Sequence, residues 1–121
     1  MKKYIATILA FAVLSVCFSA CGWKPDVPAV PLTAPWTSLN LPVKENAVVW
    51  KSDPTEFRAV HKDDKKTVTK SYTETLKGQG WQLGKFDENG DRYYIEMSKG
   101  SEKLELEFYD FNNTGVVIYK K

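Results

Sequence analysis

The sequence predicts an α+β domain, a two-layer sandwich in which one helix packs on a mostly antiparallel sheet of five to six strands. Several segments after residue 80 alternate apolar and polar residues at the period of a strand. Turn signals containing glycine or asparagine separate these segments. One segment between residues 63 and 80 instead spaces its apolar residues by four, which is typical of a helix face.

Two short strands are expected before the helix. The first covers residues 48–50, and the turn signal Ser-Asp-Pro follows at residues 52–54. The second covers residues 57–61, where every second side chain should face the same side of the sheet: Phe57, Ala59 and His61.

The helix prediction rests on a stripe of three apolar residues, Val68, Tyr72 and Leu76. Asp63 or Asp64 is expected to cap its start, and Gly78 or Gly80 its end. Several threonines in this segment are poor helix formers, so the helix should depend on packing of its apolar stripe.

Four further strands are predicted after Gly80, over residues 81–86, 93–98, 103–109 and 116–119. The Asn89-Gly90 pair is the strongest hairpin signal. The resulting order is strand, strand, helix and four strands, and one helix can cover one face of such a sheet. The covered face should carry Ile95, Leu104, Leu106 and Phe108. The other face should present Glu96, Glu105, Glu107 and Tyr109 to water.

The start of the chain has the pattern of a secretory signal. Two lysines precede an apolar run over residues 5–16, and residues 18–21 read Phe-Ser-Ala-Cys. This stretch resembles the lipobox of bacterial lipoproteins, although Phe18 stands where an aliphatic residue is usual. The resemblance implies removal of residues 1–20 and lipidation of Cys21. A plain signal peptide or an N-terminal membrane helix are the alternatives, and the apolar run is short for the latter.

The resemblance also implies a cellular location. Residue 22 is glycine and not the aspartate that retains lipoproteins in the inner membrane. The lipoprotein is therefore expected in the cell envelope, at the periplasmic face of the outer membrane if the organism is Gram-negative.

Residues 21–42 are expected to form a lipidated, proline-rich tether, and residues 43–121 a single domain. The tether carries five prolines, Pro25, Pro28, Pro31, Pro35 and Pro42. Proline disfavours both helix and central strand, so an extended spacer of up to about 60 Å is expected at ~3.1 Å per residue. Trp36 has two interpretations: it folds back to cover an edge of the domain, or it docks a partner.

The charge and the cysteines exclude several function classes. Removing Lys2 and Lys3 with the signal leaves 17 − 2 = 15 basic side chains against 15 acidic ones. No single-sign field remains to attract nucleic acid. Cys17 is lost with the signal and Cys21 would carry the lipid, so neither a disulfide nor a cysteine-based metal site is expected.

Candidate chemistry is sparse, and no catalytic residue, metal or cofactor is predicted. His61 with Asp63 and Asp64 could form half a metal site, but a strand end followed by a helix cap is the expected interpretation, because zinc usually takes three or four protein ligands. Glu105 and Glu107 could resemble a carboxylate pair, yet alternating glutamates are more typical of a solvated strand face. No nucleophile elbow or phosphate-binding glycine loop is present.

Two function classes remain open. The first is a non-catalytic module of the envelope that binds a protein or acts in assembly or inhibition. Its expected partner surface is Tyr94, Tyr109, Phe111 and Trp36. The alternative is a small-ligand-binding domain or minor enzyme that uses the crevice between helix and sheet. In architecture alone, the domain resembles the one-helix α+β modules of uncharacterised bacterial lipoproteins.

Overall fold

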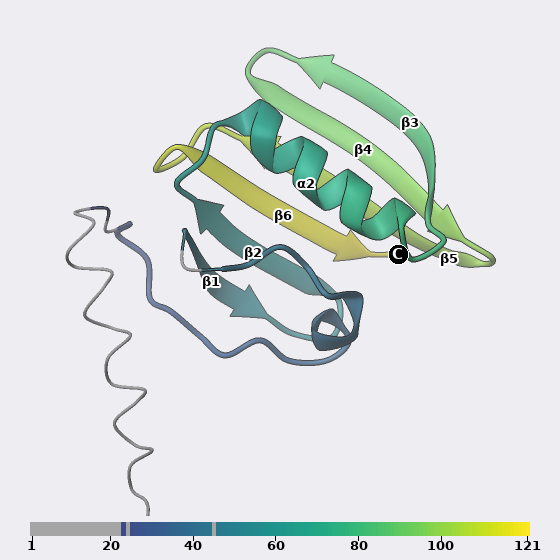
Figure 1. Cartoon of the computed structure of the whole chain (residues 1–121), viewed down its shortest axis with the longest axis horizontal. Coiled ribbons are helices and arrows are strands. Elements are labelled where there is room, and N and C mark those ends of the chain that lie inside the picture. Colours follow the sequence, from purple (N-terminus) through teal and green to yellow (C-terminus); the bar gives the residue numbers. More distant parts are fainter. Residues whose placement is uncertain (1–22, 24, 45) are drawn as a thin grey trace, which may run out of the picture.

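The computed structural model describes residue 23 and residues 25–44 and 46–121 (Figure 1). The predicted signal sequence and the predicted lipidation site Cys21 lie outside the described residues. The part that is described contains one α-helix of 13 residues, and none of its helices is both long and apolar enough to cross a membrane.

Six antiparallel strands form one sheet in the order β1-β2-β6-β5-β4-β3. The C-terminal strand β6 therefore inserts between β2 and β5, in the middle of the sheet. The strands are β1 (Ala47–Ser52), β2 (Glu56–His61), β3 (Gln82–Asn89), β4 (Arg92–Lys99), β5 (Glu102–Tyr109) and β6 (Thr114–Lys120).

One helix, α2 (Lys65–Lys77), crosses one face of this sheet (Figure 1). Its predicted stripe of Val68, Tyr72 and Leu76 is buried, and Asp64 and Gly78 occupy the two cap positions. The predicted two-layer α+β architecture and its element order are confirmed.

The strand register explains the core. Ile95 lies opposite Leu106, Leu106 opposite Ile118, and Ile118 opposite Phe57, so one apolar row crosses four strands. Side chains alternate across a strand, so each such row faces α2 while its neighbours face away. The residues expected under the helix are each at most 2% exposed: Ile95, Leu104, Leu106 and Phe108.

The β3 strand departs from the predicted alternation. The pairing of β3 with β4 slips between Leu83 and Lys85, which places a bulge at Gly84. As a result Leu83 and Phe86 lie on the same face of the sheet, opposite Met97 and Ile95. The sequence period alone had placed them on opposite faces, because an extra residue in a strand leaves no mark in an alternating pattern.

The proline-rich segment packs against the domain instead of extending away from it. The Val30 N–H donates to the carbonyl of Val49 at 2.9 Å, and Thr33 bonds to Ser52. A short 3-10 helix, η1 (Trp36–Leu39), follows and places Trp36 in the core. The spacer expected up to residue 42 is therefore docked along β1 from Val30 onward (Figure 1). Apolar residues of this segment pack against the buried core, and the number of prolines gives no sign of such packing.

Candidate functional site

The face of the sheet opposite α2, which we call the open face, carries a set of aromatic rings and arginines. We call this set the aromatic–arginine cluster, and it consists of Trp50, Arg58, Arg92, Tyr109, Phe111 and Tyr119. It extends over β1, β2, β6, β5 and the start of β4. The open face is thus predominantly aromatic and charged, with each large ring beside a cation or another ring.

An irregularity in β1 brings Trp50 onto the open face. The pairing of β1 with β2 slips between Val49 and Lys51, so that Trp50 is the extra residue of a bulge opposite Arg58. The Arg58 guanidinium carbon lies 5.5 Å from the centre of the Trp50 ring, a cation–π geometry. The Trp50 indole nitrogen is buried and has no hydrogen-bond partner among the described residues.

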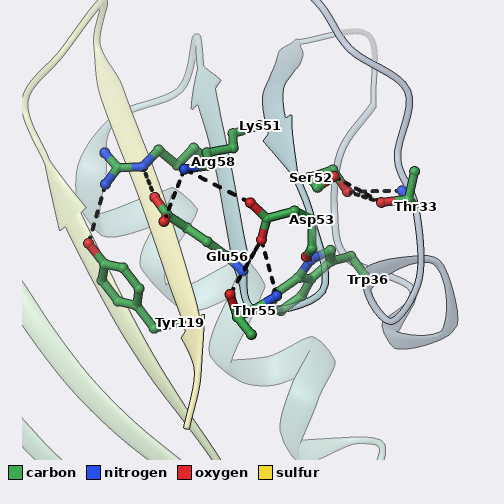
Figure 2. Close-up of polar contacts among 9 residues, drawn as sticks. All are labelled: Thr33, Trp36, Lys51, Ser52, Asp53, Thr55, Glu56, Arg58 and Tyr119. Atoms are coloured by element: carbon green, nitrogen blue, oxygen red, sulfur yellow. Dashed lines mark hydrogen bonds and ion pairs between the residues drawn. The ribbon is translucent and has the colours of Figure 1, made fainter.

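Arg58 is held in place by charged and hydrogen-bonded neighbours (Figure 2). Its Nε pairs with the Glu56 carboxylate, and its Nη2 donates to the Tyr119 hydroxyl at 3.3 Å. Lys51 Nζ reaches the other Glu56 oxygen at 3.2 Å. Burial by itself would raise the pKa of Glu56, but the hydrogen bonds from Arg58 and Lys51 outweigh it and lower that pKa. These contacts therefore hold the Arg58 guanidinium in one position within the domain.

The turn between β1 and β2 joins this network to the N-terminal segment (Figure 2). The Asp53 carboxylate accepts hydrogen bonds from the backbone N–H groups of Thr55 at 3.1 Å and Glu56 at 2.9 Å. These bonds, that of Thr55 first, lower the pKa of Asp53. The Asp53 carbonyl accepts the indole N–H of Trp36 at 2.6 Å. One turn thus holds both the open face and the docked tether.

The Tyr109 ring packs closely against Gly115, its partner on the neighbouring strand β6. A Cβ built on Gly115 would lie 2.5 Å from Cζ of that ring, so only glycine permits this approach. The Arg92 guanidinium carbon also lies 4.5 Å from the centre of the Tyr109 ring. Arg92 in turn pairs with Glu107 at 2.9 Å. Burial raises the pKa of Tyr109, so its hydroxyl stays protonated.

Three of the four predicted partner-surface residues lie on or beside the open face. Tyr94 is half-buried on β4, opposite Glu107 in register. Phe111 is 39% exposed in the loop after β5, with its ring centre 6.2 Å from that of Tyr109. Trp36 is fully buried against Phe57 and therefore belongs to the core, in agreement with its first interpretation.

His61 lies at the helix side of the sheet and is 5% exposed. Its Nε2 lies 2.7 Å from the Tyr72 hydroxyl, and burial lowers its pKa to about 4, so the imidazole is neutral at pH 7. Asp64 occupies the helix cap and accepts a hydrogen bond from Thr67. No group of three or more metal-ligating side chains forms in the described part of the chain.

Glu105 and Glu107 have separate partners on the open face. Glu105 pairs with Lys121 at 3.2 Å and Glu107 with Arg92. Glu105 also lies directly opposite Glu96, which is unfavourable for two like charges on neighbouring strands. A hollow of about 410 Å³ lies beside Glu105 and Glu96 and is lined mainly by charged side chains.

The crevice between helix and sheet is filled by side chains. Tyr72 from α2 packs edge-on against Phe108 at 5.6 Å and beside Phe57 at 6.5 Å, and all three are fully buried. A smaller hollow of about 190 Å³ lies at one end of this layer, next to His61 and Ser71. The arrangement is that of a packed core with a hollow at its margin.

Trp50, Arg58, Arg92 and Tyr119 were not singled out from the sequence. Strand alternation places Glu105, Glu107 and Tyr109 on the open face. Arg58 lies there for the same reason, because its neighbours Phe57 and Ala59 face the helix. The bulge that turns Trp50 to the same face has no comparable signal in the sequence.

Comparison of the chain with protein-family models, with curated proteins and with solved structures finds no match in any of the three.

Proposed function

We propose that this chain is a lipid-anchored, non-catalytic module of the bacterial envelope, and that its open face binds a protein partner. The anchor is Cys21, proposed from its resemblance to a lipobox. The working surface is the aromatic–arginine cluster together with Tyr94.

The observation that carries this proposal is the composition and rigidity of the open face. Trp, Tyr and Arg are the residues that most often dominate the energy of protein interfaces. Here Arg58 is held by Glu56 and Tyr119, and Arg92 by Glu107 and the Tyr109 ring. Side chains fixed before association lose less entropy on binding, which favours a partner that meets this surface.

The docked tether supports a position close to the membrane. The Trp23 indole N–H donates to the carbonyl of Asn112 at 3.4 Å, in the loop that also contains Phe111. Trp23 lies two positions after Cys21, a reach of about 7 Å for extended chain. A lipid on Cys21 would therefore hold this end of the sheet near the bilayer surface, and the partner would be another component of the envelope.

The charged lining of the 410 Å³ hollow favours a protein partner over a small ligand. Sites for small molecules are mostly apolar, with a few convergent polar groups. The 410 Å³ hollow instead contains Lys85, Asp87 and Glu96, whose charges are suited to a wet rim. The crevice proposed for a ligand or minor enzyme is occupied by Tyr72, Phe57 and Phe108.

Site-specific photocrosslinking in cells tests the proposal. A photoreactive phenylalanine analogue replaces Tyr94 on the open face, and in a matched variant it replaces Glu74, which is exposed on α2. We expect a discrete adduct to one envelope protein from position 94 and none from position 74. The adduct should weaken when Arg92→Ala is added. Equal adducts from both positions, or adducts only from position 74, would contradict the proposed surface.

A further inference from the structure

The two edges of the sheet differ in how they are covered. Val30 and Thr33 bond to β1 and close that edge. At the opposite edge, no backbone hydrogen bond among the described residues reaches β3 except through its pairing with β4 (Figure 1). An uncovered strand of this length presents unpaired N–H and C=O groups that can add a further strand.

The β3 edge is also the most apolar exposed part of the strands. Leu83 is 45% and Phe86 49% exposed, and these are two of the three large hydrophobic side chains described as exposed. The bulge at Gly84 places both on the helix side of the sheet, where Phe86 lies 5.5 Å from the Tyr93 ring. On the opposite side of the same strand, Lys85 and Asp87 form an ion pair at 3.5 Å.

We propose that β3 pairs with β3 of a second copy of this chain, antiparallel and with Phe86 opposite Phe86. In that register Lys85 lies opposite the second copy's Asp87, and Asp87 opposite its Lys85. The Phe86 rings meet on the helix side, and both ion pairs form on the open side. Aromatic pairs and opposite charges are both favourable across neighbouring strands.

The charges of β3 favour this register over the two adjacent registers. Moving the twofold axis one residue toward the N-terminus sets Lys85 opposite Lys85. Moving it one residue toward the C-terminus sets Asp87 opposite Asp87. Like charges directly opposite each other are destabilising, so only the axis at Phe86 combines charge complementarity with burial of the exposed ring.

The pairing joins two six-stranded sheets into one continuous sheet. In each copy, the outer edge of β3 is then paired with the other copy. Both α2 helices then lie on the same side, and the open faces stay accessible. The inference is independent of the lipid anchor and of the open-face partner.

Disulfide trapping tests the register in the full-length chain, purified in detergent and treated with an oxidant. Phe86→Cys places the two thiols directly opposite each other, within disulfide reach. Leu83→Cys is a control of nearly equal exposure, but its thiols would lie about 20 Å apart at ~3.3 Å per residue. The unsubstituted chain gives the background from Cys17 and Cys21. We expect a strong dimer band on a non-reducing gel only from Phe86→Cys.

Charge-reversal substitutions in β3 provide a second test of the register. In the Phe86→Cys background, Lys85→Asp alone and Asp87→Lys alone each set two like-charge pairs across the twofold axis. We expect each to raise the concentration needed for half-maximal crosslinking by about tenfold. A mixture of the two variants restores opposite charges and should crosslink as a heterodimer. Equal bands from Phe86→Cys and Leu83→Cys, or no preference for the heterodimer, would overturn the proposal.

Discussion

The His61 imidazole is held neutral in the core by burial, and its Nε2 lies 2.7 Å from the Tyr72 hydroxyl. A functional histidine normally reaches solvent or a substrate, whereas this ring is edge-on to the Tyr72 ring at 5.3 Å. Its hydrogen bond satisfies both polar groups in an otherwise apolar layer, which is what buried polar groups require. At the residue scale, the only histidine of the chain is therefore a structural element that is sensitive to acid.

Stability should fall as the pH drops from about 6.5 to about 4, because the unfolded chain accepts a proton at His61 before the folded chain does. The folded pKa is lowered, so the stabilisation is fully present above pH 6.5 and is lost toward pH 4. The shift corresponds to at most about 3 kcal/mol. Urea unfolding as a function of pH measures it. His61→Gln should have a flatter profile over this window, and an unchanged slope would contradict the assignment.

Gly115→Ala should destabilise the domain by about 1–3 kcal/mol, because the new methyl group enters the space of the Tyr109 ring. Gly78→Ala is the matched control, since its Cβ would meet nothing closer than 3.5 Å and its φ is −63°. Adding Tyr109→Ala should remove most of the effect of Gly115→Ala. A double-mutant cycle from thermal unfolding measures this coupling, and purely additive effects would show that the ring does not lie over Gly115.

The central strands β5 and β6 illustrate the element scale. In β5, buried residues alternate with less buried residues of the open face, so β5 contributes Leu104, Leu106 and Phe108 to the core, whereas β6 is buried on both faces over residues 114–118. The register of β5 with β4 and β6 is set by this alternation, because a slip by one residue would turn every apolar side chain to the open face. The loss of stability should therefore depend on whether the substituted residue of β5 faces the helix or the open face.

Leu106→Ala should reduce the free energy of unfolding by about 2–5 kcal/mol, since the side chain is fully buried between β4, β6 and α2. Glu105→Ala, one residue earlier, removes only a partly exposed ion pair with Lys121 and should change it by less than about 1 kcal/mol. Urea unfolding of both variants makes the comparison. Similar losses at the two positions would mean that the strand register is wrong.

At the scale of the whole molecule, the N-terminal segment is part of the folded unit. Trp36 and Leu41 belong to the core cluster, with Leu32 and Leu39 packed against it. The Trp36 ring centre lies 5.7 Å from that of Phe57, and its indole N–H is bonded to the β1–β2 turn. The folding unit therefore begins before residue 43, where the sequence had placed its boundary.

A fragment of residues 43–121 should be less stable than a fragment of residues 25–121, because it lacks Trp36 and Leu41. Loss of a fully buried tryptophan alone corresponds to about 3–5 kcal/mol. Trp36→Ala in the longer fragment should reproduce most of the difference. Thermal unfolding of the three proteins measures it, and equal melting temperatures would show that the docked segment contributes nothing to the fold.

Cys21→Ser tests the proposed anchor in the complete chain. We expect the variant to be found outside the membrane fraction, or to remain unprocessed, because several acyl chains bind almost irreversibly at ~0.8 kcal/mol for each buried methylene. Fractionation followed by mass measurement of the N-terminus distinguishes these outcomes. A variant that is cleaved, mature and still bound to the membrane would exclude lipid anchoring through Cys21.

The sequence by itself determined the architecture, the helix stripe and the residues that fill the core under the helix. These features depend on periodicity, and a period of 3.6 or 2 is visible in the order of residues. Tyr94 and Tyr109 could be assigned to the helix-free face for the same reason.

Only the tertiary structure decided the rest. The bulges at Gly84 and Trp50, the contact of Tyr109 with Gly115, and the docking of Trp36 all join residues through geometry that no local pattern records. A bulge changes which face a side chain occupies without changing the composition of the strand. A docked segment is stabilised by partners far away in the chain. Alternation accounts for Arg58 and Tyr109 in the aromatic–arginine cluster, whereas the bulge in β1 adds Trp50. Among the described residues, only pairing with β4 supplies backbone hydrogen bonds to β3, and this too follows from tertiary structure.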